Sequence, residues 1–316
     1  MTARTPNGEL RFDGRVAMIT GAGAGLGRSH AMLLAARGAH VVVNDLHADA
    51  ADAVVAEITA AGGSAAAHAA DISQPDGASG LVQTALDAWG RVDIVINNAG
   101  LLQPTDFADM TPEIFDRAYA VNLRASFLVT HAAWKPMVAQ GYGRVVHTSS
   151  NSGLLGIAGS TGYASAKAGL WGFTRSLSLE ASPLGIHVNA IGPIAYTAMS
   201  RTSRVAPATW KSGEGDAWSR RLDAALVSPA VAWLAHEDCT LNGQVLSVAA
   251  GRVARFVIGL NHGFVRDALT VEDVRDHDEL LQTEAPDEFP ATANEESIAL
   301  HRRVMPRPDP GRRLDK

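Results

Sequence analysis

Tyr163 and Lys167 stand four residues apart in the segment YASAK, inside a stretch whose apolar spacing predicts a helix over residues 163–181. Side chains four residues apart on a helix project from the same face, so both can reach one ligand. A phenol ionises at about pH 10, too high for a base at neutral pH, but a nearby ammonium favours the phenolate and lowers the phenol's pKa. The pair therefore indicates a tyrosine that exchanges a proton with a substrate, with Lys167 supplying the charge.

Two further polar residues could serve the same reaction. Ser150 follows a strand expected at residues 144–148, and its hydroxyl would donate a hydrogen bond to a substrate oxygen, stabilising charge as a hydride moves. Asn122 lies in a helix expected at residues 112–139 and would hold a water that links Lys167 to solvent. Each of the four residues has an ordinary alternative, such as a half-buried aromatic, a solvated lysine, a strand-end cap or a locally satisfied amide. Together they predict interconversion of a secondary alcohol and a ketone.

A glycine-rich turn lies near the start of the chain, in the string TGAGAGLG. It places Gly21, Gly25 and Gly27 between an apolar run at residues 16–20 and an apolar-periodic stretch that continues to residue 39. Glycines at such a turn let the backbone approach a pyrophosphate on the positive N-terminus of the helix. The spacing is GxxxGxG, and a purely structural turn is the alternative. The strand before the turn and the helix after it favour a dinucleotide site.

Acidic residues follow the second and third predicted strands. Asp45 ends the strand at residues 41–44, where its carboxylate can accept hydrogen bonds from ribose hydroxyls and repel a 2′-phosphate. NAD is therefore expected rather than NADP, although a strand-end carboxylate that faces water is the alternative. Asp71 and Ile72 could hold the adenine through an acceptor and an apolar contact; the alternative for Asp71 is a cap of the following turn.

The elements that would position these candidate residues are short buried strands that alternate with amphipathic helices. Strands are expected at residues 16–20, 41–44, before 71, 94–96, 144–148, 187–191 and 244–248, and helices at residues 48–61, up to 89, 112–139, 163–181 and 229–235. This alternation predicts an α/β fold, a Rossmann-type three-layer doubly wound parallel sheet. Ligands of such sheets bind in the crevice at the carboxyl ends of the strands, where the candidate residues gather.

We expect one domain over residues 11–251, with a substrate loop at residues 197–223 that is mobile over the crevice. A C-terminal extension follows at residues 252–316. Within it, Thr270 and Asp273 have the spacing of a capping box that opens a helix to about residue 282, and Asn294 is a candidate cap of another. The last ten residues are expected to be disordered.

Composition narrows the class of protein. The chain has 316 residues, of which 47% are hydrophobic and 19% charged, as in a soluble globular enzyme. A net charge of −6 without a basic face argues against nucleic acid as a partner. The single cysteine, Cys239, excludes an intrachain disulfide and leaves no thiolate cluster, so no metal is expected. We expect no membrane span and no secretory signal, and hence a cytosolic protein.

Several of these motifs together resemble the short-chain dehydrogenase/reductase family: TGAGAGLG, NNAG, Asn122, SSNSG, YASAK and NAIGP. The resemblance runs from about residue 11 to residue 251. Within the family, LRFDGR, VVVNDL, YGRVVHTSSNSG and WLAHEDC look like the (3R)-hydroxyacyl-CoA dehydrogenase part of peroxisomal multifunctional enzymes. The resemblance implies a catalytic tetrad of Asn122, Ser150, Tyr163 and Lys167, and homo-oligomers, dimers or tetramers, formed through the long helices.

The resemblance also implies Asn98 beside the cofactor, and Ile194 and Thr197 near the nicotinamide amide. Lys167 could hold the nicotinamide ribose. The residues expected to bind the cofactor are Gly21, Gly25, Leu26, Gly27, Asp45, Asp71, Ile72, Asn98, Ala99, Gly100, Tyr163, Lys167, Pro193, Ile194 and Thr197.

The substrate expected from this resemblance is a small molecule, an apolar 3-hydroxyacyl thioester. Arg201, Arg204 and Lys211 are candidate contacts for coenzyme A phosphates, with solvated side chains as the alternative. The segment after Asp45 and residues 197–223 depart from the subgroup's pattern, which leaves a steroid or another bulky secondary alcohol as a rival substrate. A sensor that binds NAD without turnover is a rival of another class, and the intact serine, tyrosine and lysine set argues against it.

Overall fold

The computed structural model describes residues 8–199 and 220–304. The chain divides into two compact units, the first ending at Arg255 and the second beginning at Phe256. The boundary expected after residue 251 lies four residues too early, because residues 252–255 pair with the sheet. Of the substrate loop expected at residues 197–223, residues 200–219 lie outside the described ranges, and so do the last ten residues of the chain.

The first unit is built on one eight-stranded sheet with the order β3-β2-β1-β4-β5-β6-β7-β8. Its strands are β1 Val16–Ile19, β2 His40–Asp45, β3 Ser64–Ala69, β4 Ile94–Asn97, β5 Gly143–Thr148, β6 Ile186–Ile194, β7 Val245–Ala249 and β8 Arg252–Arg255. All neighbouring pairs from β3 to β7 are parallel, which confirms the predicted doubly wound sheet. The chain runs outward from β1 to β3 and resumes on the other side at β4, so the switch point lies between β1 and β4.

Strand β8 is an antiparallel edge that the sequence analysis missed. It returns along β7 through the two-residue turn Ala250-Gly251, in which both residues have positive φ, 52° and 80°. Positive φ at both central residues is the mark of a type I′ hairpin turn, for which Asn-Gly is the usual signal. Ala-Gly does not carry that signal, because alanine rarely adopts this conformation.

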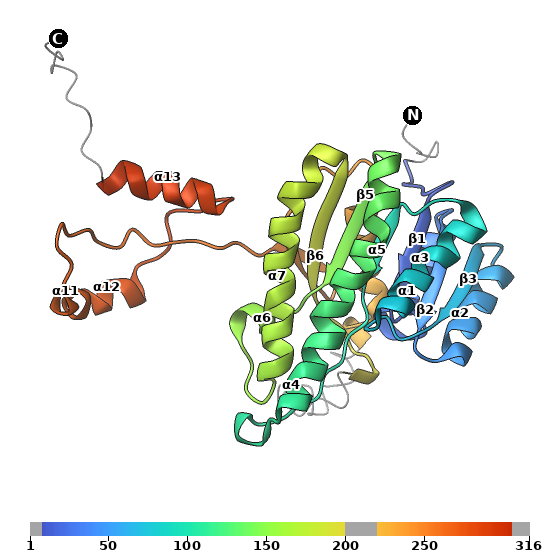
Figure 1. The fold of residues 1–316 in the computed structure, drawn as a ribbon, viewed down its shortest axis with the longest axis horizontal. Coiled ribbons are helices and arrows are strands. Elements are labelled where there is room, and N and C mark those ends of the chain that lie inside the picture. The colour runs from blue at the N-terminus through green and yellow to red at the C-terminus, as the bar shows by residue number, and fades with distance from the viewer. Residues whose placement is uncertain (1–7, 200–219, 305–316) are drawn as a thin grey trace, which may run out of the picture. The chain divides into compact units, whose positions relative to one another are not determined.

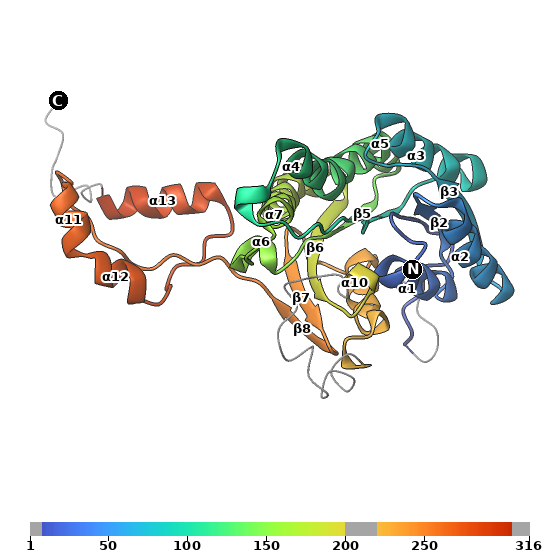
Figure 2. The same ribbon diagram turned by 90° about the horizontal axis from the view of Figure 1, so that it is seen from below.

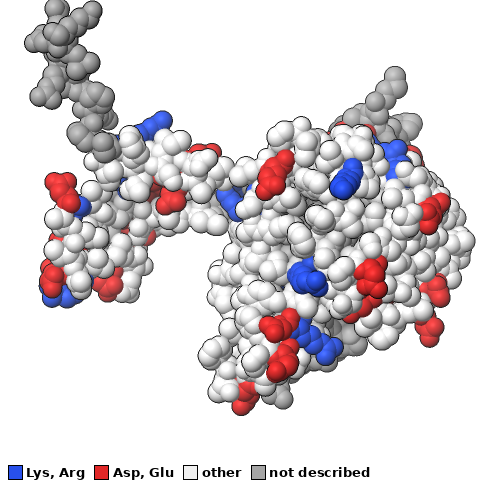
Figure 3. Space-filling model, viewed as in Figure 1, with Lys and Arg blue, Asp and Glu red and all other residues white. Residues whose placement is uncertain are grey.

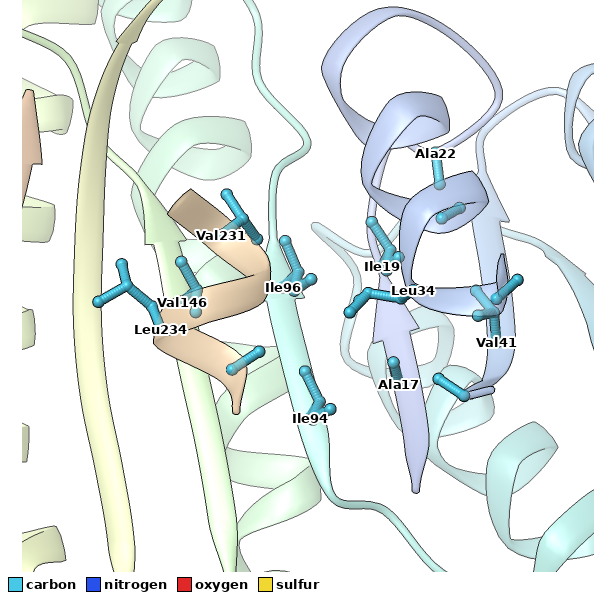
Figure 4. Packing of buried hydrophobic residues seen from close by; sticks show 14 of the residues in the cluster. Ala17, Ile19, Ala22, Leu34, Val41, Ile94, Ile96, Val146, Val231 and Leu234 are labelled. Atoms are coloured by element: carbon cyan, nitrogen blue, oxygen red, sulfur yellow. The ribbon is translucent and has the colours of Figure 1, made fainter. Parts of the chain in front are cut away.

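Helices cover both faces of the sheet, as Figure 2 shows. The first face carries α1 Gly25–Ala36, α2 Ala48–Ala60 and α10 Ser228–Ala235; the second carries α3 Pro75–Trp89, α5 Ala125–Gln140 and α7 Thr161–Ala181. Successive strand residues point to opposite faces. Ile94 and Ile96 of β4 therefore join the first core with Leu34 and Val231 (Figure 4), while Val95 joins the second.

The helix predicted at residues 112–139 is divided. It consists of α4 Pro112–Tyr119, a π-helical turn at Ala120–Arg124, and α5. A short helix that the sequence analysis did not predict, α6 Ser152–Leu155, precedes α7. Short 3₁₀ turns lie at Phe107–Asp109, Ser182–Leu184 and Ala224–Leu226.

The second unit contains α11 Val271–Asp276, α12 Asp278–Thr283 and α13 Ala293–Val304. The capping box of Thr270 and Asp273 is confirmed, although the helix it opens breaks at His277. Asn294 is not a cap: it lies inside α13, and the Thr292 hydroxyl accepts the Glu295 N–H at 3.2 Å.

On the face of the sheet unit shown in Figure 3, acidic and basic side chains are interspersed. Among the described helices, none is long and apolar enough to cross a membrane.

Candidate active site

The glycine turn and the NNAG segment meet at the switch point between β1 and β4. The Thr20 hydroxyl accepts the backbone N–H groups of Asn98 and Ala99, each at 3.0 Å. The Asn98 amide donates to the carbonyl oxygens of Thr20 and Gly21 at 3.0 and 3.1 Å. These four hydrogen bonds hold the two predicted cofactor segments together.

The glycines of the turn are needed for space as well as conformation. Gly21 and Gly25 have left-handed φ values of 60° and 55°. A Cβ on Gly27 would lie 2.3 Å from the Gly21 carbonyl oxygen, and one on Gly25 would lie 3.5 Å from Thr197 Cγ2. Helix α1 begins here without a side-chain cap and without an acidic residue in its first turn, so its N-terminus suits an anionic ligand. The adjacent Leu26 packs against the first core.

Asp45 lies at the carboxyl end of β2, where the sequence analysis expected it. One carboxylate oxygen accepts the Gly23 N–H at 3.0 Å and the other accepts the His47 N–H at 3.1 Å. A Cβ on Gly23 would lie 2.8 Å from Asp45 Oδ2. Gly23 was not among the predicted residues, although its place in TGAGAGLG could have suggested it.

Asp71 follows β3 and makes the contact that was its structural alternative. Its carboxylate accepts the Ser73 N–H at 2.9 Å, which caps the turn. The side chain is exposed, while Ile72 is buried. The end of β3 lies beside Asp45, whose carbonyl oxygen accepts the Ala70 N–H at 3.1 Å.

Lys167 is buried on α7, with 3% of its surface exposed. Its Nζ donates to the Thr148 carbonyl oxygen at the end of β5, at 2.7 Å, and lies 5.7 Å from the centre of the Tyr163 ring. Burial lowers the pKa of the Lys167 ammonium to about 7. The structure therefore brings the lysine to the tyrosine, as the spacing predicted, and removes much of its preference for the charged form.

Tyr163 lies two residues inside the first turn of α7. Burial raises the pKa of its phenol, and a hydrogen bond from the Ser150 hydroxyl acts in the opposite direction. The expected lowering of the Tyr163 pKa is therefore wrong for the groups that the structure contains, because the desolvation of the phenolate outweighs its stabilisation.

Asn122 sits in the π-helical turn and is fully buried. Its amide accepts the Leu101 N–H at 3.0 Å and donates to the carbonyl oxygens of Leu101 and Ala118 at 2.8 and 2.9 Å. A Cβ on Gly100 would lie 3.0 Å from Asn122 Oδ1 and 3.4 Å from Lys167 Nζ. The amide and the amine thus border one space, which the absence of a side chain at Gly100 keeps open.

Ser150 follows β5, at the same edge of the sheet. Its hydroxyl lies 2.7 Å from the Ser152 hydroxyl, and it accepts the Ser152 N–H at 3.2 Å. Ser152 was not predicted, although it belongs to the string SSNSG.

Pro193 and Ile194 end β6, next to β7. Strand β5 pairs with β6 only as far as Ile191. The backbone nitrogens of Ile191 and Pro193 both point to the β5 side of β6. Because β5 no longer pairs with β6 at Pro193, the N–H that proline lacks leaves no gap in the ladder. Arg201, Arg204 and Lys211, the candidate contacts for coenzyme A, lie outside the described residues.

Comparison with known proteins gives a consistent result. A family model described as short chain dehydrogenase matches residues 15–207. Mouse peroxisomal multifunctional enzyme type 2 is 41% identical over 281 residues, covering 85% of this chain and 36% of the relative. A putative short-chain type dehydrogenase/reductase from Mycobacterium tuberculosis is 41% identical over 258 residues, covering 79% of this chain and 87% of the relative.

Among solved structures, the full-length multifunctional enzyme type 2 of Drosophila melanogaster is similar with a TM-score of 0.76 and 34% identity, over 93% of this chain and 50% of that chain. A short chain dehydrogenase from Mycobacterium avium gives a TM-score of 0.73 and 33% identity, over 89% of this chain and 99% of that chain. The chain thus spans 36% of the length of the mouse multifunctional relative and 50% of that of the Drosophila one.

A doubly wound sheet with a glycine turn at its switch point, and beside it a buried lysine with a partly buried tyrosine, defines a class of oxidoreductases. The chain belongs to the short-chain dehydrogenase/reductase family. It is an oxidoreductase that acts on hydroxyl groups.

Proposed function

We propose that the enzyme uses NAD to interconvert a secondary alcohol and a ketone, with a 3-hydroxyacyl-CoA or a similar apolar molecule as its substrate. One observation carries the proposal: Ser150, Tyr163 and Lys167 meet at the switch-point edge of the sheet, beside the glycine turn. An acid and base pair beside a dinucleotide cradle is what hydride chemistry requires.

The residues at this edge fit a dinucleotide. The uncapped N-terminus of α1 would hold the pyrophosphate, and Gly27 leaves the close approach that a Cβ would fill. The Asp45 carboxylate would accept the ribose hydroxyls and would repel a 2′-phosphate, which favours NAD over NADP. When NAD is bound here, it supplies the acceptor for the hydride that leaves the hydroxyl-bearing carbon.

The chain's own groups handle the proton. The phenolate oxygen of Tyr163 would take the proton of the substrate hydroxyl, while the Ser150 hydroxyl donates a hydrogen bond to the same substrate oxygen. Lys167 would stabilise the phenolate through its charge. An amide oxygen has two lone pairs, and among the described residues Asn122 Oδ1 accepts the Leu101 N–H alone. Its second lone pair would hold a water in the space it shares with Lys167 Nζ.

The surroundings of Ser150 favour an apolar substrate. Helix α6 starts two residues after Ser150, and it and the following loop expose Leu154, Leu155 and Ile157. Phe107 is 77% exposed, and its neighbour Asp106 lies 3.4 Å from the Cβ position of Gly159, in the loop that follows α6. An exposed apolar rim of this kind suits an acyl chain.

The same apolar rim would also accept a steroid or another bulky secondary alcohol, which is the second candidate. This substrate would use the same four polar residues and would need no contact for coenzyme A. The cytosolic location and the homo-oligomer expected from the sequence stay predictions.

The test is nicotinamide absorbance at alkaline pH with NAD and three alcohols: a 3-hydroxyacyl-CoA, the matching N-acetylcysteamine thioester and a hydroxysteroid. We expect turnover of the coenzyme A thioester, a higher KM for the truncated thioester, and loss of turnover in Tyr163→Phe with NAD binding retained. Turnover of the steroid alone would establish the second candidate. NAD binding without turnover of any alcohol would indicate the sensor.

Cofactor choice is tested separately. In Asp45→Ser the ribose acceptor becomes a hydroxyl and the repulsion of a 2′-phosphate disappears, so we expect the ratio of kcat/KM for NAD to that for NADP to fall at least about tenfold. An unchanged ratio would contradict the role of Asp45.

A further inference from the structure

Ser152, the first residue of α6, is 9% exposed and contacts the Ser150 hydroxyl twice. The Ser152 N–H donates to Ser150 Oγ at 3.2 Å, and the two hydroxyl oxygens lie 2.7 Å apart. None of the roles described above requires Ser152.

A serine hydroxyl has one proton and two acceptor lone pairs. The Ser152 N–H can only donate, so it occupies one lone pair of Ser150 Oγ. The bond between the two hydroxyls could run in either direction. If Ser150 donated to Ser152, it would have no proton left for Tyr163 or for a substrate oxygen.

The Ser150 proton has another acceptor nearby, Asn151 Oδ1, at 3.4 Å. That contact is long for a bond between a hydroxyl and an amide oxygen. A Ser150 hydroxyl that donates toward Tyr163 lowers the pKa of the phenol. Donation from Ser152 to Ser150 leaves the Ser150 proton available for this role.

We propose that Ser152 is a positioning residue: its N–H and its hydroxyl fill both lone pairs of Ser150 Oγ, which frees the single Ser150 proton for Tyr163 in the free enzyme and for the substrate oxygen once the substrate is bound. A hydroxyl that accepts hydrogen bonds is polarised and donates more strongly. Ser152 thus strengthens the donor that stabilises charge on the substrate oxygen. This inference rests on the proposed function, because it assigns Ser152 a part in the same reaction.

The fold holds Ser152 in place. Gly153, the next residue, packs so closely on α7 that a Cβ there would lie 2.7 Å from the Ala168 N atom. The Ser152 carbonyl oxygen also accepts the Gly156 N–H at 3.0 Å, which closes the turn of α6. Helix α6 is therefore fixed against the helix that carries Tyr163 and Lys167.

The test compares Ser152→Ala and Ser152→Cys, which remove the strong donor, with Ser152→Thr, which keeps a hydroxyl. We expect kcat for alcohol oxidation to fall about tenfold in the first two, as for the loss of one hydrogen bond, with the Kd for NAD unchanged. The pH of half-maximal kcat/KM, which reports the free enzyme, is expected to rise in both, because Ser150 then stabilises the phenolate less. Ser152→Thr should restore kcat and the pH profile.

The double variant Ser150→Ala/Ser152→Ala is expected to be no slower than Ser150→Ala, because Ser152 acts only through Ser150. The matched control is Ser178→Ala, which removes another buried serine, one whose hydroxyl donates to the Arg175 backbone carbonyl of its own helix, and it should keep wild-type kcat.

Wild-type kcat and pH profile in both Ser152→Ala and Ser152→Cys would overturn the inference, and so would additive losses in the double variant. Tyr163→Phe separates this failure from failure of the proposed function. If Tyr163→Phe is inactive while Ser152→Ala is unchanged, only the role of Ser152 is wrong. If Tyr163→Phe keeps its turnover, the proposed function itself is wrong.

Discussion

At the scale of single residues, burial acts on Tyr163 and Lys167 in opposite directions. It raises the pKa of the phenol and lowers the pKa of the ammonium to about 7, because each neutral form is the cheaper one to bury. The proposed function requires the two groups to titrate as a pair, so that the first proton to leave belongs to both. Its loss gives either a neutral amine or a phenolate beside an ammonium, and the second state is the proposed base.

The pH profile of Lys167→Met tests this coupling. In the wild type, we expect kcat/KM for alcohol oxidation to rise with pH through about 7, the pKa of Lys167. Without the ammonium, the Tyr163 phenol titrates alone, above its ordinary value of 10.0 because burial raises its pKa. The rising limb of the pH profile of kcat/KM should therefore move above pH 10, and activity at pH 8 should fall about a hundredfold or more. A limb that stays near pH 7 in Lys167→Met would contradict the coupled pair.

Two glycines offer a matched comparison of alanine substitutions. In Gly27→Ala the new methyl group would lie 2.3 Å from the backbone oxygen of Gly21, which cannot move without shifting the turn. We expect a loss of about 1–3 kcal/mol in the free energy of unfolding and weaker NAD binding. In Gly172→Ala, inside α7, the methyl group has no neighbour within 4 Å, and we expect a gain of about 0.5–1 kcal/mol. Urea unfolding and NAD titration measure both; a neutral Gly27→Ala would refute the steric argument.

The sequence predicted the residues whose spacing is local. Tyr163 and Lys167 needed only helical periodicity, and Asp45 only a strand end. Ser152 and Gly23 were missed because their contacts depend on where a short helix packs and how a turn folds back on a neighbouring strand. Burial by the folded chain also decided the pKa of Tyr163, and spacing along the sequence does not report burial.

At the scale of elements, the π-helical turn at Ala120–Arg124 separates two helices that share one apolar pattern. Its extra residue changes the helical phase, so that Asn122 faces the segment after NNAG instead of a helix face. The π-helical turn and the β7–β8 hairpin were both missed for the same reason. Neither alters hydrophobic periodicity, the signal from which helices and strands are predicted.

Asn122→Ala tests the structural part of this element. The Leu101 N–H and C=O would each lose their side-chain partner, at a cost of about 1–3 kcal/mol for each group that stays buried. We expect a lower free energy of unfolding in urea and a loss of turnover. Asn122→Asp keeps the acceptor for the Leu101 N–H and should retain part of the stability. Wild-type stability in Asn122→Ala would show that the turn is held by its backbone alone.

At the scale of the whole molecule, each core contains a buried histidine. His30 of α1 bonds the Ser228 hydroxyl at the start of α10 at 2.8 Å, which links the first helix of the unit to the last helix on that face. His147 of β5 lies 3.2 Å from the Asn97 amide of β4, and that amide donates to Thr130 of α5 at 2.9 Å. The second network joins β4, β5 and α5. It lies at the ends of the two strands that lead to Asn98 and Ser150.

These two histidines make the fold sensitive to acid. Burial lowers the pKa of both to about 3, from 6.5. The folded state keeps them neutral while the unfolded chain takes up a proton below pH 6.5, so their contribution to stability is complete above 6.5 and is lost as the pH falls. Protonation of each histidine in the unfolded chain should lower the free energy of unfolding by about 1.4 kcal/mol for every pH unit below 6.5, until the pKa of the folded state is reached.

Urea unfolding of the wild type at pH 7.5 and pH 5.5 should therefore show a loss of about 2–3 kcal/mol from the two histidines together. The His30→Asn/His147→Asn variant should be less stable at pH 7.5, because it loses well-packed side chains, and should lose less on acidification. His68 and His187, whose pKa values are also lowered by burial, remain in the variant and keep part of the slope. An equal loss in both proteins would mean that the two imidazoles are protonated in the folded state. Burial would then be far less complete at these two sites than the packing of the cores requires.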